Sequence, residues 1–175
     1  MTLLGKANAH LASAALTKYR ERFRTVGLFE NSIYPGIEAA LDELRRGGHS
    51  LAVATAKPTV FARRIIEHFG LTCFFDSVDG SELDGSRADK AELIQYLLCR
   101  DRIACSNAVM IGDREHDMVG ARKNGVVGIG ALWGYGSKTE LENAGACVCV
   151  ETPQHLASAV RAIGGNAECC ERRAL

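Results

Sequence analysis

Residues 108–117 read AVMIGDREHD, and this stretch gives the strongest indication of the fold class. Its opening apolar run is too short for a helix and is typical of a buried strand, and a helical pattern then continues to Asn124. Strand, loop and helix recur in this order over residues 51–69 and 126–144. Because such alternation places helices on both faces of a parallel sheet, the sequence predicts an α/β fold with a doubly wound parallel sheet.

The remaining elements are shorter. Two more strands are expected at residues 74–78 and 147–150. Apolar residues recurring at helical spacing, with glycine or proline at the ends, predict further helices over residues 37–44, 89–98 and 153–163. A helical alternation also covers residues 7–23.

The composition suits a single globular domain with a small ligand. The chain has 175 residues, with 21 Lys and Arg against 21 Asp and Glu, so no net charge attracts nucleic acid or an anionic membrane. The 7 cysteines lack zinc-site spacing and are interpreted as reduced thiols. The N-terminus shows no basic region followed by an apolar stretch, and no long apolar run occurs elsewhere. We therefore expect a cytoplasmic protein with neither a nucleic-acid partner nor a membrane partner.

Two aspartates follow the strand expected at residues 108–111. Asp113 comes at the end of this strand, and Asp117 lies in the opening turn of the next helix. Ligands of an open parallel sheet bind beyond the carboxyl ends of its strands, and two carboxylates near one point suit Mg²⁺. In the structural alternative, Asp113 caps the helix and Asp117 is a solvated acid favoured by the helix dipole. The metal site is the favoured interpretation.

Thr55 and Lys90 are candidates at neighbouring strand ends. Thr55 closes the apolar run 51–55, and its hydroxyl could hold a phosphate oxygen together with the amides that lead into the next helix. The alternative for Thr55 is a helix cap or turn residue. Lys90 begins a helix, where cations are disfavoured, so its position suggests that it neutralises an anion in the crevice. The alternative for Lys90 is solvated surface.

These positions match three motifs of the haloacid dehalogenase superfamily in order and spacing: an apolar strand ending in Thr55, a later Lys90, and Gly112-Asp113-x-x-x-Asp117 after another strand. Residues 34–36 (YPG), 81–85 (SELDG) and 132–136 (LWGYG) resemble the phosphoglycolate phosphatase branch. The resemblance implies a Rossmann-like core and a Mg²⁺-dependent phosphatase that works through an aspartyl-phosphate.

The resemblance also implies roles for individual residues. Thr55 and Lys90 would be the catalytic residues. Thr55, the amide of Ala56 and Lys90 would bind the transferring phosphoryl group, and Lys90 would also neutralise the attacking carboxylate. Asp113 would ligate Mg²⁺, and Asp117 would support the metal and its waters.

By the same resemblance the chain has three parts. Residues 1–33 would be the remnant of a helical cap, which in this family chooses the substrate. Residues 34–163 would form the α/β core, and residues 164–175 a flexible tail. Arg20, Arg22 and Arg24 could reach a substrate carboxylate, although a basic helix face is commonly only solvated.

The first motif of the family, a strand ending in Asp-x-Asp-Gly-Thr whose first acid attacks phosphorus, has no counterpart, since no aspartate precedes Asp42. Residues 82–86 (ELDGS) imitate it but follow Asp79-Gly80-Ser81 rather than a buried strand, so they are not expected to replace it. We expect the core to lack this strand, which would lie between the strands ending at Thr55 and Ile111. Those two strands would then pair directly or leave a gap, with reduced stability and a tendency to self-associate through exposed edges.

The sequence therefore favours a magnesium-dependent phosphomonoester hydrolase of the phosphoglycolate phosphatase type, acting on a small phosphorylated metabolite and showing little turnover without its nucleophile. The alternatives are a non-catalytic module that binds phosphate or metal, and a 5'-nucleotidase-type phosphatase. A receiver-like signalling domain would need a phosphoacceptor aspartate at a central strand end, and none is visible. Residues 133–136 could touch a ligand, although a turn that covers the core is favoured.

Overall fold

The structure is a computed structural model that describes residues 14–165 except residues 16, 19–20 and 23–25. The helix expected over residues 7–23 and the tail expected over 164–175 therefore lie largely outside the described residues. Within the described part of the chain, no helix is long and apolar enough to cross a membrane.

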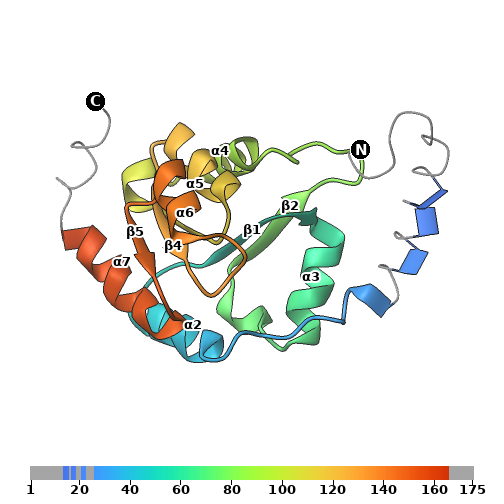
Figure 1. The fold of residues 1–175 in the computed structure, drawn as a ribbon, viewed down its shortest axis with the longest axis horizontal. Helices are drawn as coiled ribbons and strands as arrows, with labels where there is room; N and C mark the ends of the chain where they lie inside the picture. The colour runs from blue at the N-terminus through green and yellow to red at the C-terminus, as the bar shows by residue number, and fades with distance from the viewer. Residues whose placement is uncertain (1–13, 16, 19–20, 23–25, 166–175) are drawn as a thin grey trace.

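Strands and helices alternate from residue 37 onward (Figure 1). The strands are β1 (Ala52–Pro58), β2 (Ser77–Ser81), β3 (Val109–Gly112), β4 (Val127–Ala131) and β5 (Val148–Val150). The α-helices are α2 (Ile37–Arg46), α3 (Thr59–His68), α4 (Lys90–Asp101), α5 (Glu115–Lys123), α6 (Lys138–Ala144) and α7 (Leu156–Gly165). Short 3₁₀ turns are η3 (Thr72–Phe74), η4 (Cys105–Asn107) and η5 (Pro153–His155).

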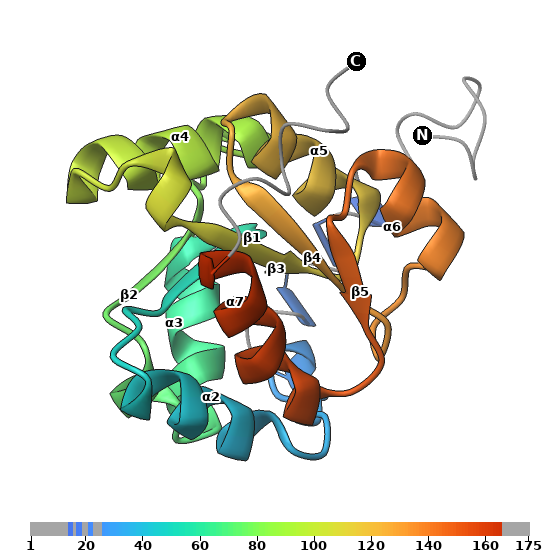
Figure 2. The ribbon, with the colours of Figure 1, turned by 90° about the vertical axis from the view of Figure 1, so that its left-hand side faces the viewer.

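Every strand pair is parallel, and helices cover both faces of the strands. Figure 2 shows α4, α5 and α6 on one side and α2, α3 and α7 on the other. This layering confirms the α/β class with parallel strands that was predicted from the alternation of apolar strand and amphipathic helix.

The apolar core is centred on β4. Ile129 in this strand is fully buried and packs with Ala40, Val150 and Leu156 on the side of α2 and α7. A second cluster on the opposite side includes Met118, which is also fully buried. Burial of side chains of this size stabilises a fold by roughly 1.5–3 kcal/mol each.

The expectation of a strand at residues 74–78 was wrong in its position. Residues 72–74 form the 3₁₀ turn η3, and β2 begins only at Ser77. β2 pairs with β1 along its length, with Val53 opposite Val78 and Thr55 opposite Gly80. The strand was missed because its residues are polar or small, although Asp79 and Ser81 are buried. The statement that residues 82–86 do not follow a buried strand was therefore also wrong.

The strands form two separate sheets, one of β1 and β2 and one of β3, β4 and β5. Among the described residues, β1 pairs only with β2 and β3 pairs only with β4, so each has one edge without a strand partner in this part of the chain. The structure thus shows the gap rather than direct pairing of β1 with β3. All four residues of β3 are only half-buried, whereas most of β4 is buried.

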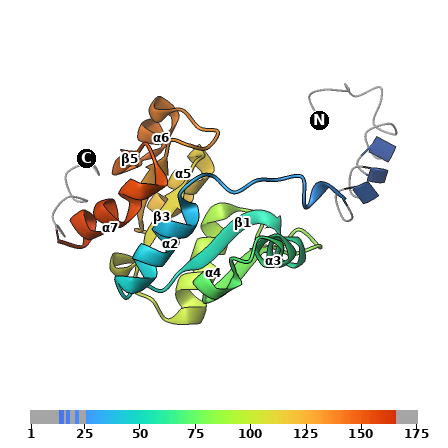
Figure 3. The same ribbon diagram turned by 90° about the horizontal axis from the view of Figure 1, so that it is seen from below.

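The segment before α2 leaves the body of the fold (Figure 3). Its inner end nevertheless packs on the core: Leu28 is fully buried, and the Phe29 ring lies 4.5 Å from the His68 ring of α3. Farther out, Arg22 Nη1 donates to Glu30 Oε2 at 2.6 Å. Arg20 and Arg24 lie outside the described residues, so the suggested role of these arginines stays a prediction.

Candidate functional site

Lys90 contacts β1 and α5, the helix that follows β3. It is the first residue of α4, behind the N-cap Asp89, whose Oδ1 accepts hydrogen bonds from the amides of Ala91 at 2.8 Å and Glu92 at 3.1 Å. The Lys90 Nζ donates to the carbonyl oxygen of Ala54 in β1 at 2.6 Å and lies 3.0 Å from Asp117 Oδ1 in α5. The ammonium therefore sits between β1 and the start of α5.

Asp117 is buried rather than solvated. The side chains of Lys90 and Asp117 are only 11% and 12% exposed, so their ion pair is shielded from water. The other oxygen, Oδ2, accepts the amide of Arg114 at 3.3 Å. A Cβ at Gly112 would overlap the Asp117 side chain, which explains why glycine ends β3 at this point. The structural alternative of a solvated first-turn acid thus fails for Asp117.

Asp113 is held by the loop after β4. Its Oδ2 accepts the amide of Tyr135 at 2.9 Å, and a Cβ at either Gly134 or Gly136 would overlap Asp113. The N-cap of α5 is Arg114 rather than Asp113, so the helix-cap alternative for Asp113 also fails. Trp133 packs against the main core cluster, as expected of a covering turn. Tyr135, in contrast, is 86% exposed.

Thr55 lies within β1, one residue after Ala54, whose carbonyl Lys90 contacts. The expectation that this strand ends at Thr55 was wrong: β1 continues to Pro58, with an irregularity in its pairing with β2 between Thr55 and Pro58. The Thr55 Oγ1 accepts the amide of Lys57 at 3.2 Å, and the carbonyl oxygen of Ala56 accepts the Ser81 hydroxyl at 3.0 Å, so both contacts fall in this irregular part. Lys90 thus contacts both β1 and Asp117, and Asp113 follows Gly112 at the end of β3.

The carboxylates of Asp113 and Asp117 are the candidate ligands for a divalent cation. Among the described residues, no group of three or more His, Cys, Asp or Glu side chains could hold a metal ion. The Asp113 carboxylate accepts one hydrogen bond at Oδ2, from the Tyr135 amide. Mg²⁺ commonly takes one or two carboxylates and completes its octahedron with waters and substrate phosphate oxygens. The donor set here fits that mode of binding, with Asp113 as the available ligand.

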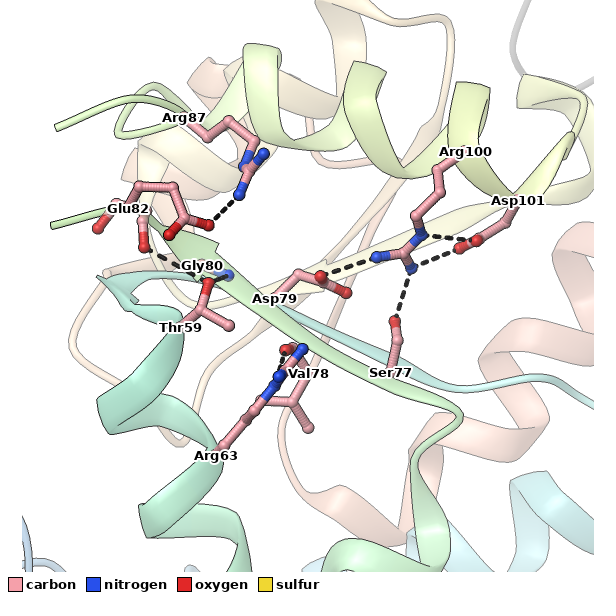
Figure 4. Close-up of polar contacts among 11 residues, drawn as sticks. Thr59, Arg63, Ser77, Val78, Asp79, Gly80, Glu82, Arg87, Arg100 and Asp101 are labelled. Carbon is pink, nitrogen blue, oxygen red and sulfur yellow. Dashed lines mark hydrogen bonds and ion pairs between the residues drawn. The ribbon is translucent and has the colours of Figure 1, made fainter. Parts of the chain in front are cut away.

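Sequence reasoning missed a second polar cluster beside the site (Figure 4). Asp79 in β2 is 7% exposed, and its Oδ1 accepts from Arg100 Nη1 at 2.8 Å. Arg100 also pairs with Asp101 and donates to Ser77 Oγ at 3.0 Å. Asp79 Oδ2 is buried and has no partner within the described part of the chain. The available signal was the spacing of two between Ser77, Asp79 and Ser81, which is the period of a strand.

The loop after β2 does not supply a replacement acid. Asp84 Oδ1 accepts the amide and the hydroxyl of Ser86 at 2.9 and 2.8 Å, which makes Asp84 a turn residue. The neighbouring Glu82 pairs with Arg87. The expectation that residues 82–86 do not act as the nucleophile motif therefore has a structural reason, although the reason first given for it was wrong.

Comparison with known proteins assigns the family. The model of the haloacid dehalogenase-like hydrolases matches residues 4–131. The chain belongs to this family. A predicted phosphatase from Clostridium acetobutylicum has a similar crystal structure, with a TM-score of 0.83 and 44% identity over 87% of this chain and 71% of that one. The family and the Rossmann-like fold that the motifs implied are thus confirmed.

Curated relatives carry several different names. A 5'-nucleotidase from Pseudomonas aeruginosa is 50% identical over 127 residues, 73% of this chain and 58% of its own length. The tyrosine-protein kinase PtkA from Mycobacterium tuberculosis is 38% identical over 77% of this chain and 46% of its own length. A phosphoglycolate phosphatase from Vibrio cholerae is 25% identical over 82% of this chain and 64% of its own length. This chain thus spans about half to two thirds of the length of these relatives.

Proposed function

We propose that the chain carries the phosphate-binding and metal-binding part of a magnesium-dependent phosphomonoester hydrolase that acts on a small phosphorylated metabolite. The observation that carries the proposal is the Lys90 ammonium, held 3.0 Å from Asp117 Oδ1 and 2.6 Å from the Ala54 carbonyl oxygen of β1. A buried cation at converging strand ends, with carboxylates beside it, is suited to a phosphoryl group and a divalent cation.

Each residue has a role in this proposal. Lys90 neutralises the phosphoryl oxygens, and Asp117 fixes the direction of its side chain. Thr55 and the amide of Ala56 orient the phosphoryl group at β1. Asp113 holds Mg²⁺, which would neutralise charge that develops on the phosphoryl oxygens.

The attacking carboxylate is a separate part of the proposal. In the described part of the site, Asp117 is paired with Lys90, and Asp113 is the metal ligand. We therefore propose that the nucleophilic aspartate belongs to a further strand, seated between the edges of β1 and β3 that have no strand partner among the described residues. Backbone groups at a strand edge favour pairing with another strand, which supports this position. The chain alone is then expected to bind phosphate with little turnover.

A specific observation favours a 5'-nucleotide as the substrate. The 5'-nucleotidase is 50% identical to this chain, whereas the phosphoglycolate phosphatase is 25% identical. The resemblance to the phosphoglycolate phosphatase branch rests on short stretches of sequence, residues 34–36, 54–58, 81–85 and 132–136. We therefore keep a small phosphorylated acid as the second candidate. The cytoplasmic location stays a prediction.

The experiment compares two forms of the protein with p-nitrophenyl phosphate and Mg²⁺. One form is this chain, and the other is extended at its N-terminus with a strand ending in Asp-x-Asp-Gly-Thr. The extended form is expected to hydrolyse the ester, and Asp113→Ala in that form is expected to abolish turnover. Rapid turnover by the unextended chain would refute the assignment of the nucleophile. Phosphate binding by both forms without turnover by either would favour the non-catalytic alternative.

A further inference from the structure

The backbone at Tyr135 is fixed close to Asp113. The Tyr135 amide donates to Asp113 Oδ2 at 2.9 Å, and the glycines on both sides pack so closely that a Cβ at either would overlap Asp113. The peptide therefore has little freedom to move away from the carboxylate. The Tyr135 side chain itself is exposed to solvent.

The Tyr135 ring has no packing role that explains its position. At 86% exposed, it is the most exposed large apolar side chain in the described part of the chain. The adjacent Trp133, in contrast, packs against the core cluster. A large aromatic ring held on a fixed backbone beside an anion site is a common means of binding a planar ligand.

Arg114 supplies a second planar group next to Asp113. Its Nε donates to Glu140 Oε1 at 2.9 Å, and the same oxygen accepts the amide of Glu115 at 3.0 Å. Glu140 is fixed in turn, because its amide donates to Ser137 Oγ at 3.1 Å. The ion pair with Glu140 therefore orients the guanidinium, while 49% of the Arg114 side chain is exposed.

The backbones of Tyr135 and Arg114 both adjoin the proposed phosphoryl site. The Arg114 amide donates to Asp117 Oδ2 at 3.3 Å, and the other oxygen of Asp117 contacts Lys90 at 3.0 Å. The backbone amides of Tyr135 and Arg114 therefore each donate to a carboxylate of the site, Tyr135 to Asp113 and Arg114 to Asp117. A ligand whose phosphate reaches Lys90 would extend its leaving group past these side chains.

We propose that Tyr135 stacks on the base of a nucleoside 5'-monophosphate whose phosphate binds at Lys90, with the Arg114 guanidinium as a second planar contact. The inference rests on the proposed function and names the residues that would select a nucleotide over a smaller phosphate ester. Bases stack on tyrosine rings and on guanidinium planes, and one base on one aromatic ring contributes a factor of about ten or more in affinity.

The test measures binding rather than turnover. AMP, ribose 5-phosphate and inorganic phosphate are titrated in the presence of Mg²⁺ into the protein and its Tyr135→Ala and Tyr135→Phe variants, by calorimetry. We expect AMP to bind the protein about tenfold more tightly than ribose 5-phosphate. Tyr135→Ala should remove this preference without changing the affinity for ribose 5-phosphate, and Tyr135→Phe should keep it, since the ring remains.

Two controls separate the proposals. Arg114→Gln should reduce the AMP preference, whereas Arg122→Gln, the same change at the far end of α5, should not. Equal affinity of the protein for AMP and ribose 5-phosphate, or an AMP preference that survives Tyr135→Ala, would overturn the role of Tyr135 and leave the phosphate site standing. Failure of all three ligands to bind would overturn the proposed function and this inference together.

Discussion

At the scale of single residues, Lys90 and Asp117 depend on each other. Each side chain is largely buried, and the two charges lie 3.0 Å apart. A buried charge without its partner costs more than the pair itself contributes, because the remaining charge stays out of water. The ion pair therefore also holds α4 against α5.

Replacing Lys90 by Met is expected to lower the free energy of unfolding by about 2 kcal/mol, since Asp117 and the Ala54 carbonyl lose their shared donor. Urea denaturation measures the change. Lys123→Met, at an exposed position of α5, serves as the control and should change stability little. The double variant Lys90→Met with Asp117→Asn should recover part of the loss, and no recovery would argue against a coupled pair.

Gly112 is expected to tolerate no side chain. A Cβ there would overlap Asp117, so Gly112→Ala should destabilise the fold by about 1–3 kcal/mol. Gly164 in α7 is the matched control, because nothing lies within 4 Å of an added Cβ. Gly164→Ala should be neutral or slightly stabilising. Thermal denaturation of both variants checks this, and an unchanged melting temperature for Gly112→Ala would contradict the packing described.

The sequence located the residues that belong to one continuous strand and helix segment. Asp113 and Asp117 were identified because both lie within one strand and the helix turn that follows it. Their partners were not predictable, since the Tyr135 amide and the Lys90 ammonium reach them from other elements. Asp79 was missed for a related reason: its burial follows from pairing of β2 with β1 and from Arg100 in α4.

At the scale of elements, β2 shows how a strand forms without an apolar sequence. Its outer edge is covered by side chains of α3, where the Gly80 amide donates to Thr59 Oγ1 at 3.0 Å and the Val78 carbonyl accepts from Arg63 at 3.2 Å (Figure 4). These contacts provide hydrogen-bond partners for backbone groups that could otherwise pair with another strand. Apolar periodicity cannot predict such a strand, because its stability comes from backbone pairing and capping. The strands with apolar runs, β1, β3 and β4, were predicted to within a few residues.

Asp76 joins the starts of β1 and β2 to α2. Its carboxylate accepts the Leu51 amide at 2.9 Å and pairs with Arg45 at 2.7 Å, and these contacts, the amide first, lower the pKa of Asp76. A lowered pKa in the folded state stabilises the fold above the unfolded value of about 4, and this contribution is lost as the pH falls further. Asp76→Asn should therefore lower stability at pH 6 and reduce its further loss at pH 3.5.

Urea midpoints at the two pH values measure this effect. Glu67→Gln, at an exposed carboxylate of α3, is the control and should leave the pH dependence as it is in the unchanged protein. If Asp76→Asn and the unchanged protein lose the same stability between the two pH values, the carboxylate does not contribute as described.

At the scale of the whole molecule, the divided sheet is the main departure from a continuous doubly wound fold. The outer edge of β2 is capped by α3, whereas β1 has one edge without a strand partner among the described residues, and the Lys90 ammonium contacts the Ala54 carbonyl of this strand. β3 likewise has one edge without a strand partner. Uncapped edges favour association, so sedimentation velocity should show oligomers that increase with protein concentration. The N-terminally extended form should stay monomeric, and equal behaviour of the two forms would count against an added strand between β1 and β3.

The account depends on Lys90 and Asp113 acting on one phosphate. Calorimetry with inorganic phosphate measures this directly, with Mg²⁺ present and after its removal by a chelator. The unchanged protein and Lys123→Gln should bind phosphate equally, Lys90→Gln should bind at least tenfold more weakly, and Asp113→Asn should lose the dependence on Mg²⁺. Phosphate affinity that is the same in Lys90→Gln and Lys123→Gln would contradict a common site.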